Sequence, residues 1–490
     1  MKTIIKYFSI VLAGLILFTS CETEKLNPVP KTSISDLSAF DTKDRIINQV
    51  NGLYTGIRSG NFLGGRYHVY NDIRSDEFLN ATTNGVTGYL IWNHTVDGGE
   101  NNINSCWNAA YSAINRINVF IEGLDASGAV TKNLITQAEY DQFVGEARAM
   151  RAMTYFYLLQ MWGQPYNKNN GTSPGVPLRI TAQKSSLNND LARSTVAEVY
   201  AKIIEDLDFA ETKVLADFPT DVLDVTRVHR NAVIAFKTRV YLHMGNYAKV
   251  ISEGAKIVPQ STAPFSATSG IPNALASTFA SVFNPPYTTR ESIFSLPFTT
   301  TELPGTQNGL ASYYSPNIIG DYYVNEAAGS LWADDVNWPA SDSRRALFTV
   351  AAGKRYLQKW TRSPMSDWVP IIRYAEVLLN IAEAEAMVAN GANARAVALL
   401  NAVRQRADNT VTPWVTGDFA NAAAFVNQCL IERRIEFLGE GMRNMDIHRK
   451  LLNIPGKGSV SGVPATAGAY IWPIPTQELL YNKLCVDNPQ

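Results

Sequence analysis

The spacing of hydrophobic residues along the chain predicts a mostly helical protein. Apolar side chains recur every three or four positions over residues 41–57 and again over residues 104–121, so in each range they share one face of a helix. The first stripe consists of Ile46, Ile47, Val50, Leu53, Tyr54 and Ile57, and the second of Trp107, Tyr111, Ile114, Ile117 and Ile121. We therefore predict an amphipathic helix in each range.

Two further helices are marked by their first residues. Thr136 is followed three positions later by Glu139, and Thr195 by Glu198. This is the spacing of a capping box, in which each side chain satisfies a free backbone N–H at the helix start. The helix after Thr136 carries an apolar stripe until Gly163 ends it. Both helix starts are therefore well determined by the sequence.

Two pairs of helices joined by a short glycine turn are also predicted. Residues 229–258 contain a helix, a turn at Gly245–Asn246 and a second helix, and residues 373–406 repeat the pattern around Asn390–Gly391. Alanines stand where the two backbones must approach closely, and the arrangement resembles the tetratricopeptide helix pair. Because the full tetratricopeptide consensus is absent, ordinary helical hairpins are the alternative.

Two long segments lack helical periodicity. Residues 58–103 and 259–370 are rich in polar and turn-forming residues, with tyrosines and tryptophans spread through them. Irregular stretches of this length are uncommon inside a compact domain unless the loops are functional. The predicted fold class is therefore mostly α, with tetratricopeptide-like helix pairs as scaffold, long irregular ligand-binding loops and little β structure.

The N-terminus has the pattern of a secretory signal. Lys2 and Lys6 precede or flank an apolar run from Tyr7 to Phe18, and no acidic residue comes before Cys21. The run is shorter than the roughly 20 residues that a membrane-spanning helix needs. The three residues before Cys21 resemble the lipobox of bacterial lipoproteins, in which the signal is cut before the cysteine and the thiol carries lipid. Ordinary cleavage nearby, with an incidental cysteine, is the alternative.

Composition and charge exclude several classes of protein. The chain has 490 residues, of which 46% are hydrophobic and 18% charged, as in globular proteins. Its formal net charge is -1, and removal of the signal takes away two lysines and no acid, so no basic field for nucleic acid is present. Cys106, Cys429 and Cys485 lie far apart and are predicted to be small buried hydrophobes rather than a disulfide framework or a metal site.

Catalytic and metal-binding motifs are absent from the sequence. It contains no HExxH, GxSxG or phosphate-binding loop, and its five histidines are scattered. Asp334 and Asp335 with Asn337 could contact calcium, but they lack the glycine and closing glutamate of an EF-hand loop. A distant pair of carboxylates, with Asp72 and Asp76 as the place to look, is the one catalytic pattern left open. We predict no enzyme activity, no cofactor and no metal.

The irregular segments combine aromatic and polar residues in the way that sugar-binding surfaces do. Sugars present apolar faces and hydroxyl edges, so they are bound by flat aromatic side chains beside hydrogen-bonding groups. On this basis the predicted ligand-binding residues are Tyr67, Asp72, Arg74, Trp92, Asn93, Asn101, Tyr313, Tyr314, Tyr322, Trp332 and Trp338. For Trp92, Trp332 and Trp338 a place in the core is an equally good interpretation.

Seven stretches, taken together and in order, resemble the SusD/RagB family of outer-membrane nutrient-binding lipoproteins. They are "EARAMRAMTYFYLLQMWGQP" (146–165), "YAKIIEDLDFA" (200–210), "AFKTRVYLHMGNY" (235–247), "RYAEVLLNIAEAEA" (373–386), "LNAVRQRA" (400–407), "ERRIEFLGEGMRNMDIHR" (432–449) and "IWPIPTQELLYNKLCVDNP" (471–489). By this resemblance the chain is a non-enzymatic protein of the Bacteroidetes outer membrane. It would capture an oligosaccharide and deliver it to a SusC-like TonB-dependent transporter.

A peptide ligand, as in RagB-like members, is the alternative, since "NGLY" at 51–54 and "WN" at 92–93 echo such proteins. The resemblance divides the chain into a lipoprotein signal peptide (1–20), a lipidated tether from Cys21 (21–40), an N-terminal SusD-like helical region (41–258), an irregular ligand-binding segment (259–370) and a C-terminal helical region (371–490). Because a buried unpaired charge is costly, the charged residues of the shared motifs are expected to be paired. They are Glu146, Arg151, Glu432, Arg433, Arg434, Glu436, Arg443 and Asp446.

Overall fold

The computed structural model describes residues 38–185 and 187–489, so Cys21, the predicted signal and most of the predicted tether lie outside the described residues. The structure is 47% helical and 8% strand, which confirms the mostly α fold class. Within the described ranges, no helix is long and apolar enough to cross a membrane.

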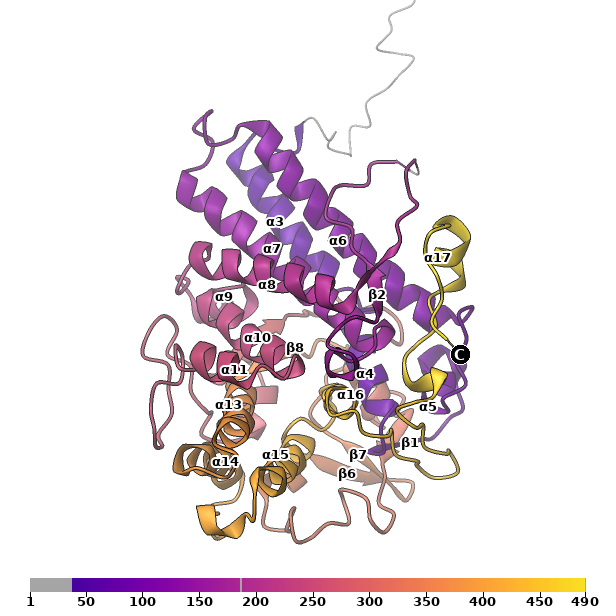
Figure 1. Cartoon of the computed structure of the whole chain (residues 1–490), viewed down its shortest axis with the longest axis vertical. Helices are drawn as coiled ribbons and strands as arrows, with labels where there is room; N and C mark the ends of the chain where they lie inside the picture. The colour runs from indigo at the N-terminus through magenta and orange to yellow at the C-terminus, as the bar shows by residue number, and fades with distance from the viewer. Residues whose placement is uncertain (1–37, 186, 490) are drawn as a thin grey trace, which may run out of the picture.

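The N-terminal half is a layer of long helices packed side by side (Figure 1). They are α3 (Lys43–Ile57), α6 (Asn101–Ser127), α7 (Gln137–Trp162) and α8 (Val196–Lys213), followed by the short α9 (Asp221–Thr226). The first two confirm the predicted stripes, with Ile46, Val50 and Leu53 buried on α3. Both predicted capping boxes are present, at Thr136 and at Thr195.

The predicted helix pairs are both present and lie next to each other. The first pair is α10 (Arg230–His243) with α11 (Tyr247–Gly254), and the second is α13 (Tyr374–Ala389) with α14 (Ala394–Ala407). Their turns need residues that accept positive φ, which Gly245 (φ 69°) and Asn390 (φ 51°) supply. Helix α11 packs on α13, so the pairs form a continuous scaffold. The chain continues through α15 (Ala422–Glu436), α16 (Arg443–Arg449) and α17 (Thr476–Tyr481).

The two irregular segments contain only short elements, and they are joined to each other. Segment 58–103 holds α4 (Arg66–Ile73), β1 (Phe78–Asn80) and α5 (Tyr89–Trp92), and segment 259–370 holds α12 (Leu310–Tyr314), β4 (Ser292–Leu296), β5 (Tyr322–Val324), β6 (Phe348–Ala351), β7 (Lys354–Leu357) and the start of β8 (Val369–Arg373). Strands β1 and β5 pair antiparallel, with Phe78 opposite Val324. The remaining antiparallel pairs are β4 with β8, β6 with β7, and β2 (Pro174–Pro177) with β3 (Arg193–Thr195).

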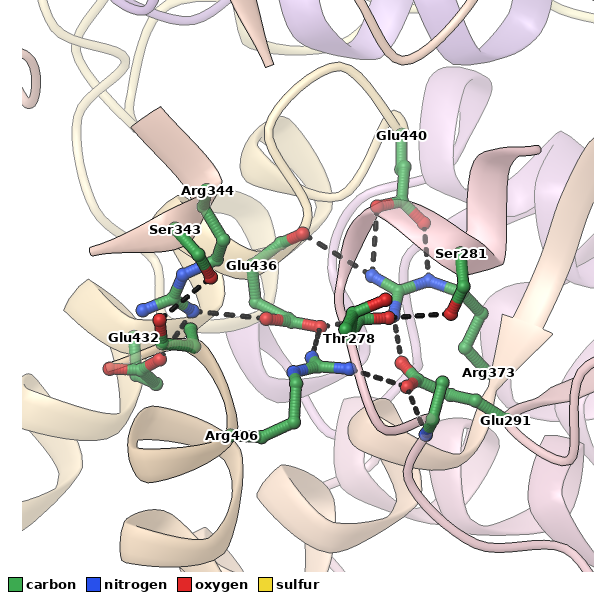
Figure 2. Close-up of polar contacts among 12 residues, drawn as sticks. Thr278, Ser281, Glu291, Ser343, Arg344, Arg373, Arg406, Glu432, Glu436 and Glu440 are labelled. Carbon is green, nitrogen blue, oxygen red and sulfur yellow. Dashed lines mark hydrogen bonds and ion pairs between the residues drawn. The ribbon is translucent and has the colours of Figure 1, made fainter. Parts of the chain in front are cut away.

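A buried network of ion pairs joins the irregular segment 259–370 to the C-terminal helices. Figure 2 shows Glu436 of α15 at its centre, facing guanidinium groups from three elements. Glu436 pairs with Arg406 at 2.5 Å, with Arg373 at 3.0 Å and with Arg344 at 3.0 Å. Arg373 and Arg406 also share Glu291, which immediately precedes β4. The network fixes the loop segment onto the helical scaffold.

The charges in this network shift one another's pKa values. Burial alone would raise the pKa of the Glu436 carboxyl, but Arg406 and Arg373 outweigh burial and hold that pKa well below its usual range. For Glu432 the balance is reversed, because burial raises its pKa more than Arg344 lowers it. Glu436 is thus held ionised by its arginines, which makes it the charge on which the network depends.

The other charged residues of the shared motifs are also paired, as predicted. Each of them pairs with an opposite charge on a different part of the chain. The pairs are Glu146 with Arg227 (2.7 Å), Arg151 with Asp206 (2.8 Å), Glu432 with Arg344 (2.6 Å), Arg433 with Asp446 (2.8 Å), Arg434 with Glu77 (2.7 Å) and Arg443 with Asp76 (3.4 Å). These motif charges therefore hold the fold together.

Candidate functional site

Five of the predicted ligand-binding residues lie together in the interior, between α4, α12 and β5. Tyr67, Asp72, Tyr313, Tyr314 and Tyr322 are each at most 1% exposed. Their polar atoms bond to the protein itself: the Tyr314 hydroxyl donates to Asp72 Oδ2 at 3.0 Å, and the Tyr322 hydroxyl donates to the Thr87 carbonyl at 3.0 Å. In this conformation they form a hydrogen-bonded core beneath the loops and offer no surface to a ligand.

Neither carboxyl of the possible catalytic pair is open to a substrate. Asp72 accepts a hydrogen bond from the Gly441 N–H at 2.9 Å, and burial raises the pKa of its carboxyl well above the usual range. Asp76 pairs with Arg434 at 3.0 Å and with Arg443 at 3.4 Å. Both groups are occupied in holding α4 against the C-terminal helices.

The predicted tryptophans differ in exposure. Trp338 is 1% exposed, and Trp92 is 8% exposed with its ring N–H donating to the Phe78 carbonyl at 2.9 Å. Trp332 is only half-buried, but the guanidinium groups of Arg345 and Arg355 lie 4.4 Å and 4.3 Å from its ring centroid. Core packing is therefore the better interpretation for Trp92 and Trp338.

Three predicted residues keep some surface, and each lies on a different stretch of the chain. Asn93 follows the buried Trp92 at the end of α5 and is half-buried, and Asn101 is exposed at the first position of α6. Trp332 lies beside β6, where it contacts Phe348 at 4.9 Å between ring centroids. Arg74, in contrast, is buried and donates to the Ala469 carbonyl at 2.8 Å. A ligand role for Asn93, Asn101 and Trp332 stays a prediction.

A surface groove of about 440 Å³ lies where the two irregular segments meet the helices α3 and α6. Its volume is within the range of roughly 300–1,000 Å³ that is typical of small-ligand sites. The lining residues are Thr55, Gly56, Arg58, Ser59 and Gly60 at the end of α3, Ala109, Ser112, Ala113 and Arg116 on α6, and Phe298, Leu303 and Pro304 after β4. We refer to it as the α3–α6 groove.

Arg58 holds the wall of the groove that comes from the irregular segment. Its guanidinium donates to the Pro297 carbonyl at 2.5 Å, pairs with Glu302 at 2.7 Å and lies 5.2 Å from the Phe298 ring centroid. The wall comes so close to Gly60 that a Cβ at this position would lie 2.0 Å from the Pro304 carbonyl oxygen. The groove therefore depends on a glycine and an arginine at the end of α3.

The groove offers hydrogen bonds and apolar contact, and it has little that could do acid–base chemistry. Thr55, Ser59 and Ser112 contribute hydroxyls, and the side chain of Leu303 is 41% exposed. Arg116 forms no ion pair with any residue in the described ranges, so its guanidinium is available to a ligand. None of the lining residues carries a carboxyl, thiol or imidazole. Such an arrangement is suited to binding rather than catalysis.

The sequence did not indicate this groove, because no single lining residue is of a type that marks a binding site. Alanine, serine and glycine are common on helix surfaces and do not mark a site. Among the lining residues only Phe298 is aromatic. A usable signal was the clustering of Gly56, Ser59 and Gly60 around Arg58 at the point where helical periodicity stops.

Family models match both halves of the chain. The model described as "Starch-binding associating with outer membrane" matches residues 29–242, and the model of the SusD family matches residues 313–490. The two matches flank the stretch that contains β4 and the Phe298 wall of the groove.

Solved structures and curated relatives agree with these matches. A SusD superfamily protein from Bacteroides fragilis is 31% identical, with a TM-score of 0.81 over 91% of this chain and 99% of that chain. One from Bacteroides thetaiotaomicron is 25% identical, with a TM-score of 0.78 over 92% of this chain and all of that chain (100%). A SusD-like protein of Formosa agariphila is 24% identical over 98% of this chain and 96% of its own length.

The fold and these matches therefore define the class as mostly helical binding proteins with long irregular segments. The chain belongs to the SusD/RagB family. A laminarin-binding SusD-like protein, 20% identical, shares its fold with a TM-score of 0.69 over 91% of this chain and 99% of that chain.

Proposed function

We propose that this chain is a non-enzymatic glycan-binding protein and that the α3–α6 groove receives the glycan. The groove carries the proposal, because it combines hydroxyl and guanidinium donors with an apolar wall and lacks the carboxyl pair of a glycosidase. Two findings on similar proteins support a sugar as the ligand. One is the description of the N-terminal family model as starch-binding, and the other is the laminarin-binding relative.

We further propose that the protein is anchored to the outer membrane by lipid on Cys21 and acts as a lid on a SusC-like TonB-dependent transporter. The family-model description, which places such proteins with the outer membrane, supports the location. Several acyl chains, as bacterial lipoproteins carry, would hold firmly, since each buried methylene contributes about 0.8 kcal/mol. The lid captures an oligosaccharide and then closes over the transporter, so that the oligosaccharide is enclosed between the two proteins.

A peptide is the second candidate for the ligand, and one observation favours it. Arg116 presents a guanidinium without an ion pair among the described residues, and a peptide ends in a carboxylate that arginine binds with two parallel hydrogen bonds. A neutral glycan has no such group.

Titration calorimetry separates these ligands. The full chain, purified in detergent, is titrated with neutral oligosaccharides and with peptides of similar size. We expect heat of binding with at least one oligosaccharide and none with the peptides. Heat of binding with peptides alone would show that the ligand is a peptide. Heat with neither class of ligand would contradict the proposal.

The lipid anchor predicts a specific effect of Cys21→Ala. Because the described residues contain no helix that spans a membrane, loss of the lipid should release the protein from the membrane fraction in cells that lack the transporter. Cell fractionation at high salt, followed by immunoblotting, measures the release. Cys106→Ala, at a buried thiol, is the matched control and should stay with the membrane. A Cys21→Ala protein that still sediments with the outer membrane would show that another anchor exists.

A further inference from the structure

The α3–α6 groove carries charge of one sign only. Its lining includes two arginines, Arg58 and Arg116, and among the described residues no aspartate or glutamate lines it. A hollow that is lined by charge of one sign raises the local concentration of ligands of the opposite sign. The groove is therefore suited to a ligand that carries negative charge.

The two arginines differ in what their guanidinium groups contact. Arg58 pairs with Glu302 at 2.7 Å and donates to the Pro297 carbonyl at 2.5 Å, so its charge is already offset. Arg116 is exposed on α6 and forms no ion pair or hydrogen bond with residues 38–185 or 187–489. The charge that the groove offers to a ligand is therefore that of Arg116.

The acidic side chains of α3 and α6 are engaged or placed elsewhere. On α3 the acid is Asp44, in the first turn, whereas the groove lies at the end of this helix. On α6, Glu122 accepts from the Ala182 N–H at 2.7 Å, and Asp125 accepts from the Tyr140 hydroxyl. The carbonyls at the end of α3 contribute only a partial negative charge, about half a unit. No carboxylate of these two helices thus offsets the free guanidinium.

The position of Arg116 on α6 directs it toward hydroxyl groups of the same groove. Ser112 and Arg116 are four positions apart, so they share one face of the helix, and both are exposed. A Cβ at Gly56 would lie 3.5 Å from Arg116 Cδ, so the stem of the arginine lies against the end of α3. The hydroxyls of Ser59 and Ser112 form no hydrogen bond within the described ranges. One charged group and two free hydroxyls therefore line the same hollow.

Given that the groove receives a glycan, as proposed above, we infer that this glycan is acidic and that Arg116 binds its charged group. The group is an oxyanion on a sugar ring, either the carboxylate of a uronic acid or a sulfate ester. A guanidinium binds such an oxyanion with two parallel hydrogen bonds. The hydroxyls of Ser59 and Ser112 exchange hydrogen bonds with the ring hydroxyls beside it. Arg116 thereby makes the groove select acidic over neutral glycans.

The charge pattern of the groove favours an acidic glycan over a peptide. A free peptide carries an N-terminal ammonium as well as a C-terminal carboxylate, and no carboxylate in the lining could pair with that ammonium. A uronate or a sulfated sugar carries negative groups only. Its remaining hydroxyls match the serine and threonine hydroxyls of the lining.

Titration calorimetry of the full chain, purified in detergent, compares matched sugars. The probes are tetragalacturonate and a sulfated carrageenan tetrasaccharide, each beside its neutral counterpart, which is the carboxyl-reduced or the desulfated form. We expect at least one acidic probe to bind about 10-fold or more tightly than its counterpart, since hydrogen bonds to charged groups contribute more than neutral ones. The two pairs of probes distinguish a carboxylate from a sulfate ester.

The preference should also depend on salt. Raising sodium chloride from about 50 mM to about 500 mM should weaken binding of the acidic probe and leave that of its neutral counterpart unchanged, because salt screens exposed charges. This readout separates a charge interaction from a difference in the shape of the two sugars.

Arg116→Gln should abolish both the preference and the salt dependence. Because Arg116 is exposed and forms no bond within the described ranges, the fold should be unaffected, which circular dichroism verifies. Lys132→Gln is the matched control, since it removes the same charge from an exposed position after α6 that lies outside the groove lining. Arg116→Lys should keep part of the preference, because an ammonium keeps the charge but lacks the planar fork.

Tighter binding of an acidic probe that is lost in Arg116→Gln and kept in Lys132→Gln supports the inference. Acidic probes that bind no more tightly than their neutral counterparts overturn it and leave the glycan-binding function in place. A preference that survives in Arg116→Gln also overturns it, because another residue would then bind the anion. Heat with none of the sugars would contradict the proposed function itself, and binding of peptides alone would assign Arg116 to a peptide carboxylate.

Discussion

Glu436→Gln is expected to lower the free energy of unfolding by about 3–5 kcal/mol, the usual cost of removing one partner from a buried ion pair. Glu436 is fully buried and accepts from Arg344, Arg373 and Arg406. Glutamine has the same shape but no charge, so three guanidinium groups would lose their shared counter-ion in the interior. Urea denaturation followed by circular dichroism measures the change.

Glu326→Gln is the matched control for this measurement. Glu326 also pairs with an arginine, Arg355, at 2.7 Å, but the pair lies at the surface with side-chain exposures of 38% and 27%. Surface pairs contribute about 0–1 kcal/mol, so this variant should be close to the unmodified protein. A loss below about 1 kcal/mol in Glu436→Gln would show that the network does not hold the irregular segment to the scaffold.

Ser112→Trp should weaken glycan binding at least about 100-fold, equivalent to about 2.7 kcal/mol. Ser112 lies on the exposed side of α6, so an indole at this position can enter the α3–α6 groove without disturbing the helix core. It would occupy the space in which the ligand is proposed to bind. Calorimetry with the best oligosaccharide of the panel gives the affinity, and circular dichroism verifies the fold.

Ala126→Trp is the control for the added indole. Ala126 is exposed on the same helix but lies in its last turn, away from the groove lining. Its affinity should equal that of the unmodified protein. Unchanged affinity in Ser112→Trp would mean that the glycan binds elsewhere. The predicted residues that keep some surface, Asn93, Asn101 and Trp332, would then be the next to test.

The helical scaffold was predictable because its signals are local. The capping boxes at Thr136 and Thr195 and the turns at Gly245 and Asn390 are determined by residues within a few positions of each other. The sequence also predicted that the motif charges would be paired, since a buried charge without a partner is costly. It could not name the partners: Arg373 and Glu436 are 63 positions apart.

The ligand-binding residues were harder to predict, because composition does not distinguish a buried tyrosine from an exposed one. In a helix or strand the period reveals the buried face, but segment 259–370 has no period to read. Tyr314 and Asp72, which are 242 positions apart, are joined by a hydrogen bond in the core. The groove depends on contact between Gly60 and Pro304. No local sequence pattern indicates a contact between residues so far apart in the chain.

A crystal structure of the protein with its oligosaccharide tests the central claim most directly. We expect the sugar in the α3–α6 groove, against the Phe298 and Leu303 wall, with Arg116 and the hydroxyls of Ser59 and Ser112 within hydrogen-bond distance. A sugar bound outside this groove, with Arg116 still facing solvent, would contradict the account.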